Sequence, residues 1–197
     1  MSRAGVIVLA AGNSSRLGRP KQLLPYRGKT LLAHTVSETL EAGLNPVVVV
    51  TGAFHTGVKK SLCGQSIDII FNPAWEEGMA SGIVAGLSNM LLLHPDVDAV
   101  IITVCDQPFI SSALLSQLVS TFDMSGKGII ACAYADSVGT PVLFGHSYFE
   151  QLLALSGSEG AKKLLKQYPD DLATVAFPDG YIDIDTGEDV QKLKGYD

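Results

Sequence analysis

The chain has 197 residues, of which 47% are hydrophobic and 17% are charged, and its formal net charge is −6. This length suits one core, so we expect residues 1–197 to form a single domain. The negative charge argues against broad nucleic-acid binding, because such binding needs Lys and Arg to neutralise many phosphates. A small anionic ligand in a local basic pocket remains compatible with it.

Neither a membrane span nor an oxidising compartment is indicated. The apolar run Val6–Ala11 is too short to cross a bilayer, and the polar residues that follow contain no signal-peptidase site. Cys63, Cys105 and Cys132 lack the spacing of a disulfide framework or a zinc site. We therefore expect a cytoplasmic protein with no membrane partner and with buried, reduced thiols.

Short β-branched runs alternate with longer segments of helical period. Strands are expected at Gly5–Ala10, Pro46–Thr51, Ile67–Phe71, Ala99–Val104 and Gly128–Ala133. Helices are expected at Leu31–Ala42, Ser81–Leu93, Ser111–Phe122, Ser147–Leu155 and Ser158–Gln167. Thr30 is the expected N-cap of the first helix, and Gly43 is its expected C-terminal stop. This alternation predicts an α/β fold, a Rossmann-like three-layer α/β/α sandwich around a mostly parallel sheet.

The C-terminal part has a different pattern, because short apolar runs there are separated by Gly, Pro and Asp. Strands are expected at Thr140–Phe144, Leu172–Ala176 and Tyr181–Ile184, with some antiparallel pairing. A final helix should begin at Thr186, whose hydroxyl can cap it.

The run Leu9–Lys21 (LAAGNSSRLGRPK) follows the first strand directly, so it should lie at the carboxyl end of the sheet. Small residues let backbone N–H groups approach a polyphosphate, and Arg16 and Lys21 offer charge-assisted hydrogen bonds. The small residues are Ala10, Ala11, Gly12, Ser14 and Ser15. The run is neither a Walker A loop nor a GxGxxG fingerprint. Composition alone leaves a plain turn with solvated charges equally open.

Two separated aspartates suggest a metal site. Asp106 follows the strand Ala99–Val104, and Asp183 and Asp185 alternate with apolar residues in YIDIDTGED. Magnesium in nucleotide enzymes commonly takes one or two carboxylates plus substrate phosphates, which fits Asp106 and Asp185. Spacing alone fits capping roles for these residues equally well.

The pattern LAAGxSxRxGxxK resembles the nucleotide-binding motif of the MobA-like NTP transferases. The segment D-x-P at Asp106 and the segment DIDTxED at Asp185 resemble two further motifs of that family. The resemblance implies one nucleotidyltransferase domain in which the loop Leu9–Lys21 wraps an NTP triphosphate. Lys21, Arg16 and Asp106 would be catalytic, and Asp106 and Asp185 would hold Mg²⁺. No residue would be covalently modified.

Within that family, Ala11, Pro20 and Lys21 resemble the molybdenum cofactor cytidylyltransferases. The resemblance implies transfer of CMP from CTP to molybdopterin that carries molybdenum, with hand-over of the product to a molybdenum hydroxylase. A methyl group at Ala11 would narrow the space beside the base and disfavour a purine. The alternatives are guanylyl transfer to the same cofactor, transfer to a sugar phosphate or methylerythritol phosphate, and a non-catalytic cofactor-binding module.

Three weaker segments also resemble the family. NPxxxxGMxxS implies nucleotide contacts through Asn72, Gly78 and Ser81, although a plain helix start is the alternative. GTPVLF implies acceptor binding by Gly139, Thr140 and Pro141, with Thr140 where many cytidylyltransferases have histidine. In GSEGAKKLL, the roles of Lys162 and Lys163 stay open, because both can be solvated surface charges.

Overall fold

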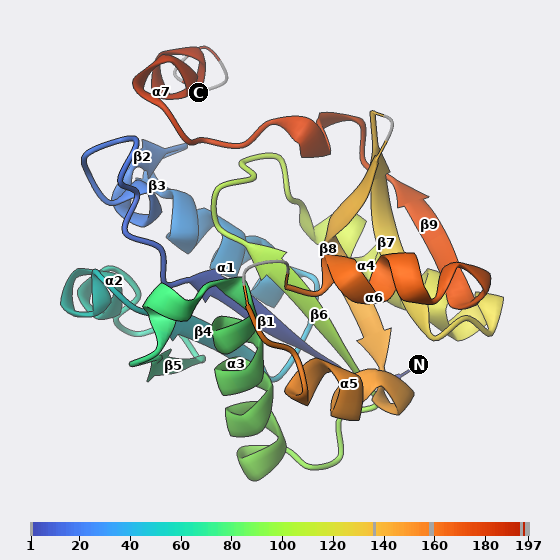
Figure 1. Cartoon of the computed structure of the whole chain (residues 1–197). Helices are drawn as coiled ribbons and strands as arrows, with labels where there is room; N and C mark the ends of the chain where they lie inside the picture. The colour runs from blue at the N-terminus through green and yellow to red at the C-terminus, as the bar shows by residue number, and fades with distance from the viewer. Residues whose placement is uncertain (1, 136, 158–159, 194, 196–197) are drawn as a thin grey trace.

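The computed structural model describes residues 2–135, 137–157, 160–193 and 195. Seven strands in this part of the chain form one sheet (Figure 1). They are β1 (Ala4–Ala10), β4 (Val47–Thr51), β5 (Asp68–Phe71), β6 (Ala99–Val104), β7 (Ile129–Tyr134), β8 (Ser137–Gly145) and β9 (Leu172–Ala176). The strand order is β5-β4-β1-β6-β8-β7-β9. A separate small hairpin joins β2 (Pro25–Tyr26) to β3 (Lys29–Thr30).

Most neighbouring strands are parallel. β1 lies between β4 and β6 in parallel register, β5 extends this half of the sheet, and β9 pairs parallel to β7. β8 runs antiparallel to both β6 and β7. All five residues of β4 are buried, as expected for a strand covered on both faces. The predicted mixture of parallel and antiparallel pairing is therefore confirmed.

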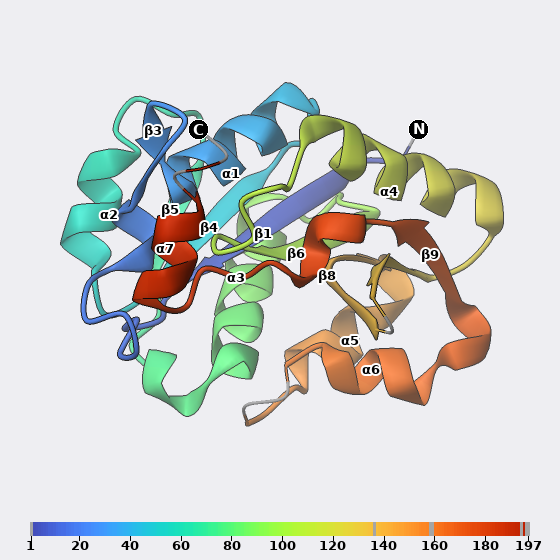
Figure 2. The ribbon, with the colours of Figure 1, turned by 90° about the horizontal axis from the view of Figure 1, so that it is seen from above.

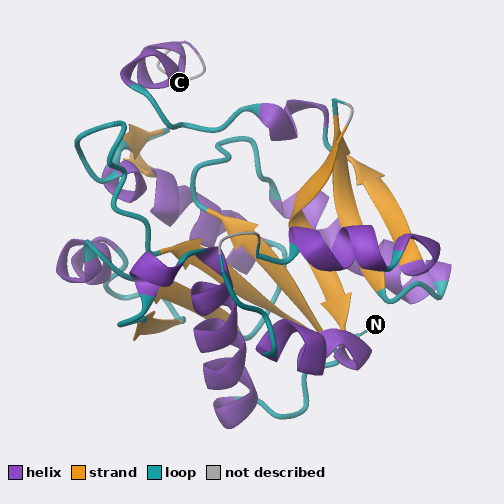
Figure 3. Ribbon diagram, viewed as in Figure 1, coloured by secondary structure: helices purple, strands orange, loops and turns teal. Residues whose placement is uncertain are grey.

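Helices cover both faces of the sheet, which gives the three layers visible in Figure 2. One face carries α1 (Leu31–Glu41) and α4 (Ser112–Ser125), and the other carries α3 (Met79–Leu93), α5 (Phe149–Leu153) and α6 (Lys162–Gln167). A buried apolar cluster fills each of the two spaces between helices and sheet. Short 3-10 helices cover Lys21–Leu23, Trp75–Glu77, His146–Tyr148, Pro169–Asp171 and Pro178–Tyr181. Figure 3 shows the distribution of helix, strand and loop.

The C-terminal segment crosses back over the sheet to α7 (Gly187–Leu193), which lies beside the β2–β3 hairpin in Figure 1 and Figure 2. Ile184, Val190 and Leu193 bury their side chains against Leu24 and Tyr26, in a cluster of their own. Burying one such side chain contributes roughly 2 kcal/mol. This apolar cluster thereby packs α7 against the β2–β3 hairpin, which follows the loop after β1.

The caps predicted from sequence are present. The hydroxyl of Thr30 accepts a hydrogen bond from the N–H of Ala33, at the start of α1. Gly43, just after α1, has a φ of 72°, a conformation that glycine adopts without strain. At α7 the N–H of Asp189 donates to the hydroxyl of Thr186.

Two expectations about the elements are wrong. Tyr181–Ile184 is not a strand: Tyr181 ends a 3-10 helix, and the N–H of Ile184 donates to the carbonyl of Asp106, which lies in a loop and not in a ladder. Cys63 is exposed rather than buried, because it lies in the turn after α2 (His55–Ser61); Cys105 and Cys132 are buried.

Helix α2 itself is absent from the prediction. The predicted helix Ser158–Gln167 begins later in the structure, at Lys162, because Gly160 and Ala161 form a turn before it. Ser158 and Glu159 lie outside the described residues. Within the described ranges, no helix combines the length and the apolar character needed to span a membrane.

Candidate active site

The loop after β1 closes on itself before Lys21. Ser14 has a φ of 53° and Gly18 a φ of 71°, and both Leu17 and Gly18 donate N–H groups to the carbonyl of Ser14. The hydroxyl of Ser14 accepts a hydrogen bond of 3.0 Å from the N–H of Lys21. The loop therefore has a compact shape that places Lys21 at the start of a short 3-10 helix.

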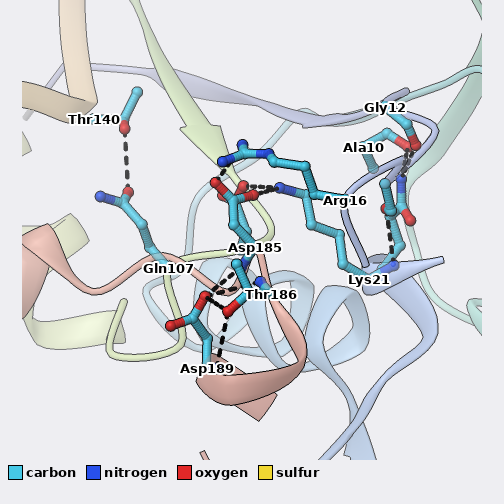
Figure 4. A network of polar contacts seen from close by, with 12 residues as sticks. Ala10, Gly12, Arg16, Lys21, Gln107, Thr140, Asp185, Thr186 and Asp189 are labelled. Carbon is cyan, nitrogen blue, oxygen red and sulfur yellow. Dashed lines mark hydrogen bonds and ion pairs between the residues drawn. The ribbon is translucent and has the colours of Figure 1, made fainter. Parts of the chain in front are cut away.

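Lys21 lies between the two predicted metal-binding aspartates, although they come from distant parts of the chain. Its Nζ is 2.5 Å from Oδ2 of Asp106 and 2.8 Å from Oδ1 of Asp185. Arg16 reaches the other oxygen of the same carboxylate, with NH2 2.6 Å from Oδ2 of Asp185. Figure 4 shows both cations directed at Asp185. The structure thus brings together Arg16, Lys21, Asp106 and Asp185, as the sequence predicts.

The electrostatics of this cluster keep Lys21 and Asp185 charged. Burial alone would lower the pKa of the Lys21 ammonium, but the charge of Asp106 and hydrogen bonds to Asp106 and Asp185 outweigh it, so the pKa is raised. Partial burial would raise the pKa of Asp185, but Lys21 and then Arg16 hold it below its usual range. The positively charged side chain of Lys21 therefore lies between the carboxyl groups of Asp106 and Asp185.

Asp183 is affected differently. Burial of the carboxyl, followed by the negative charges of Asp106 and Asp185, raises the pKa of Asp183 to about 6, although the residue as a whole is exposed. Asp183 therefore belongs to the same cluster of acidic side chains as Asp106 and Asp185.

The donor set fits a divalent cation that also binds a nucleotide. No cluster of three or more His, Cys, Asp or Glu side chains that could hold a metal occurs among the described residues. A metal ion bound here would therefore need ligands that the described side chains do not supply. Asp106 and Asp185 would provide two oxygen ligands, and phosphate oxygens and water would complete the shell, which is the usual arrangement for Mg²⁺.

A cavity of about 260 Å³ lies beside this cluster. Its lining includes most of the residues predicted to contact the nucleotide, namely Leu9, Ala10, Ala11, Gly12, Lys21, Gly78 and Asp106. Trp75 forms part of the wall, and a Cβ on Gly52 would lie 2.7 Å from Trp75 and 2.5 Å from the carbonyl oxygen of Ala11. Only glycine fits at position 52, so the wall of the cavity is closely packed.

Asn72 and Ser81 do not line this cavity. Asn72 is buried, and its amide donates to the hydroxyl of Ser81 at 2.9 Å. The Ser81 hydroxyl also lies 2.8 Å from the carbonyls of Ala74 and Gly78. The two side chains hold the turn that presents Gly78, so a direct nucleotide contact by either remains a prediction.

Two of the three predicted acceptor residues lie at a second cavity of about 150 Å³, which shares Met79 with the first. Gly139, Thr140 and Lys162 line it, whereas Pro141 and Lys163 do not. The Thr140 hydroxyl donates to Oε1 of Gln107 at 3.1 Å, which connects this cavity to the loop that carries Asp106 (Figure 4).

Sequence reasoning missed Gln22. This residue is buried, and its amide group donates to the carbonyls of Ala10 and Gly12. No periodic pattern or charge marks it. Its position immediately after Lys21, in a stretch that is otherwise apolar, is the only available signal.

Comparison with known proteins identifies the family. Residues 6–172 match the family model described as the MobA-like NTP transferase domain. The chain belongs to this family. The MobA-like chain is 30% identical over 199 residues to nicotine blue oxidoreductase of Paenarthrobacter nicotinovorans, covering 95% of this chain and 94% of the relative.

Solved structures agree. Rv0371c from Mycobacterium tuberculosis H37Rv superposes with a TM-score of 0.83 at 30% identity, covering 98% of this chain and 97% of that chain. A complex of the same protein with manganese has a TM-score of 0.78 at 27% identity and covers 98% of each chain. This MobA-like protein is accordingly a nucleotidyltransferase with the Rossmann-like fold of its structural neighbours.

Proposed function

We propose that this nucleotidyltransferase transfers CMP from CTP to the phosphate of molybdopterin that carries molybdenum, with magnesium as its metal. The observation that carries the proposal is the Lys21 ammonium held by Asp106 and Asp185 at the edge of the cavity formed by the first loop. Nucleotidyl transfer needs such a cation beside a triphosphate, because negative charge develops on the leaving pyrophosphate.

In the proposed reaction, an oxygen of the acceptor phosphate attacks the α-phosphorus of CTP. A P–O bond forms there, and the bond from the α-phosphorus to the oxygen that bridges to the β-phosphate breaks. The electron pair leaves with pyrophosphate, whose charge Lys21 and Arg16 neutralise. A divalent ion held by Asp106 and Asp185 would supply further charge compensation for the triphosphate. The acceptor is already ionised, so positioning accounts for much of the remaining rate.

The manganese complex of Rv0371c supports a divalent ion in this fold, and magnesium is our specific assignment. Cytosine is assigned from Ala11, which lines the cavity, and from Pro20 before Lys21. The methyl group of Ala11 reduces the room available for a larger base.

The acceptor is assigned to the second cavity. Because Met79 lines both cavities, a phosphate at their junction would be near the nucleotide and an acceptor alike. Lys162 offers a cation at this cavity, and Thr140 a hydroxyl. The product would then pass to a molybdenum hydroxylase in the cytoplasm.

The test is pyrophosphate release by the purified protein with molybdenum-loaded molybdopterin, Mg²⁺ and each of CTP, GTP, ATP and UTP. We expect turnover with CTP to exceed turnover with the other nucleotides. Preference for GTP would favour guanylyl transfer. Turnover only with a sugar phosphate or methylerythritol phosphate would replace the acceptor. Tight cofactor binding without turnover for any NTP would favour a binding module.

The name of one relative suggests a competing outcome, because nicotine blue oxidoreductase is 30% identical to this chain over nearly its whole length. The cysteine that lines the nucleotide cavity is Cys105, and burial, followed by the charge of Asp106, raises its pKa to about 12. This thiol is thus a poor redox nucleophile. Consumption of NADH or NADPH by the purified protein, without any NTP, would nevertheless favour an oxidoreductase.

A further inference from the structure

Gln22 binds two carbonyls of the nucleotide loop at once. The residue is 1% exposed, and its Nε2 donates to the carbonyl oxygen of Ala10 at 3.0 Å and to that of Gly12 at 2.7 Å. The side chain therefore spans the segment in which β1 ends and the loop begins. A single buried amide fixes the directions of two carbonyl groups in the backbone.

The direction of these carbonyls determines the direction of the neighbouring N–H groups. In a trans peptide unit the C=O of one residue and the N–H of the next point to opposite sides. The peptide bonds after Ala10 and Gly12 are not among the cis bonds of the chain. The N–H groups of Ala11 and Asn13 consequently point away from Gln22. Without the amide, both peptide units could rotate and the loop would lose this arrangement.

The orientation of the Gln22 amide explains why this position needs glutamine. Its Oε1 is buried and accepts no hydrogen bond from the described residues. The reversed amide orientation would place Oε1 against two carbonyl oxygens, which repel it. The NH₂ group is thus the part of the side chain that the fold uses, and neither Glu nor Met can replace it.

Gln22 also joins the loop to Lys21. It is adjacent to Lys21 on the same 3-10 helix, and the N–H of Lys21 donates to the Ser14 hydroxyl from the other end of the loop. The Gln22 amide and the Ser14 hydroxyl therefore both hydrogen-bond between the loop and this helix. Any displacement of the helix would move the Lys21 ammonium relative to the N–H groups of the loop.

We propose that Gln22 is a positioning residue, which orients the backbone N–H groups of the loop and the Lys21 ammonium toward the same triphosphate. This inference rests on the proposed function, because it concerns the site proposed to bind the NTP. It assigns to Gln22 an effect on nucleotide affinity that exceeds its effect on stability.

The test compares Gln22→Met, which keeps the volume and loses both hydrogen bonds, with Gln22→Glu, which also adds a charge facing two carbonyls. The matched control is Thr39→Val, since Thr39 is fully buried in α1 and donates one hydrogen bond of 2.8 Å to the carbonyl of Thr35, outside the candidate site. Calorimetric titration with CTP and Mg²⁺, and with inorganic pyrophosphate and Mg²⁺, is done well below the thermal midpoint of each variant.

We expect Gln22→Met to raise the Kd for CTP and for pyrophosphate about tenfold, and Gln22→Glu to raise both further. In steady-state assays the KM for CTP should rise while the KM for the acceptor stays unchanged. Thr39→Val should lower the thermal midpoint and leave both Kd values unchanged.

Unchanged Kd values in folded Gln22→Met and Gln22→Glu, with only a lowered thermal midpoint, would overturn the inference. A wild-type protein that binds CTP and pyrophosphate but transfers nothing to any acceptor would refute the proposed function instead. In that case the two Kd values would still decide the role of Gln22.

Discussion

Lys21 and Asp185 lie 164 positions apart in the chain, yet Nζ of the lysine is 2.8 Å from Oδ1 of the aspartate. The contact joins the loop after the first strand to the segment before the last helix. Behind it, Ile184 and Val190 are buried against Leu24 and Tyr26. The charged contact therefore rests on an apolar cluster that holds both segments in place.

Replacing Lys21 by alanine should lower kcat/KM for CTP by about 10²–10³-fold, because the charge developing on pyrophosphate loses its nearest cation. Lys163→Ala is the control, since Lys163 is exposed and lines neither cavity. Pyrophosphate release is measured for both, with circular dichroism to confirm folding. Normal turnover in Lys21→Ala would contradict the assigned role.

Asp106→Asn and Asp185→Asn should each raise the half-saturating Mg²⁺ concentration by roughly tenfold or more, because an amide oxygen is a weaker ligand than a carboxylate. Asp179→Asn, an exposed acid earlier in the same C-terminal segment, should leave it unchanged. The measurement is initial rate against Mg²⁺ at saturating CTP. If both site variants retained wild-type metal dependence, the ion would have to bind elsewhere.

Ala11→Gly should raise the ratio of kcat/KM for GTP to that for CTP by about tenfold, since removing a methyl group from a tight pocket is worth a change of that order. Ala53→Gly is a suitable control: its N–H donates to the carbonyl of Ala11, and its side chain is exposed. Competition assays with both nucleotides give the ratio directly. No change in the ratio would show that Ala11 does not select the base.

Lys162→Ala should raise the KM for the phosphate acceptor about tenfold, because a charge-assisted contact is lost, and should leave the KM for CTP as it is. The neighbouring Lys163→Ala should change neither constant. This pair separates a specific contact from a general effect of positive charge on helix α6. An equal rise in the KM for the acceptor with both substitutions would indicate a general effect of positive charge on α6 rather than a specific contact by Lys162.

Tyr148→Phe tests a contact outside the active site and has a defined pH dependence. The Tyr148 hydroxyl donates to Oδ2 of Asp171 at 2.6 Å, and this bond, followed by one from the N–H of Gly128, lowers the pKa of Asp171. Because the pKa is lower in the folded state, the contact stabilises the protein above the unfolded value of about 3.9. This contribution is lost as the pH falls through the folded-state pKa.

The substitution should therefore reduce the free energy of unfolding by about 1 kcal/mol at pH 7, a value kept low because Asp171 is partly solvated. The difference between wild type and Tyr148→Phe should shrink toward zero below pH 4, as urea titrations at several pH values can measure. A difference that stays constant down to pH 3 would show that the charge of the Asp171 carboxylate does not account for it.

Local signals explain which parts of the molecule could be predicted. The β4 run is apolar at every position except Thr51, so its place inside the sheet follows from the sequence, as does the cap at Thr30. Helix α2 was missed because it contains Gly57 and buries only Val58, which leaves little helical periodicity. The alternation at Tyr181–Ile184 correctly separates Asp183 from Ile184. It could not show that the backbone there bonds to the loop at Asp106 and not to a strand.

The site divides in the same way. Four site residues could be named in advance because they carry charges in recognisable motifs, namely Arg16, Lys21, Asp106 and Asp185. Their mutual distances depend on how segments that are distant in the sequence pack together, and no local pattern contains that information. Gln22 has neither charge nor motif, and its role becomes visible only when the carbonyls that it binds are in place.

The packing of α7 against the β2–β3 hairpin also bears on synthesis. The β2–β3 hairpin is made well before α7, so a growing chain on the ribosome can form β1 and its loop early. Asp185 and the cluster around Ile184 arrive only when residues 184–193 emerge. A nascent chain that lacks these residues would expose Leu24 and Tyr26 and lack one partner of Lys21, so nucleotide binding should mature only after α7 has been made.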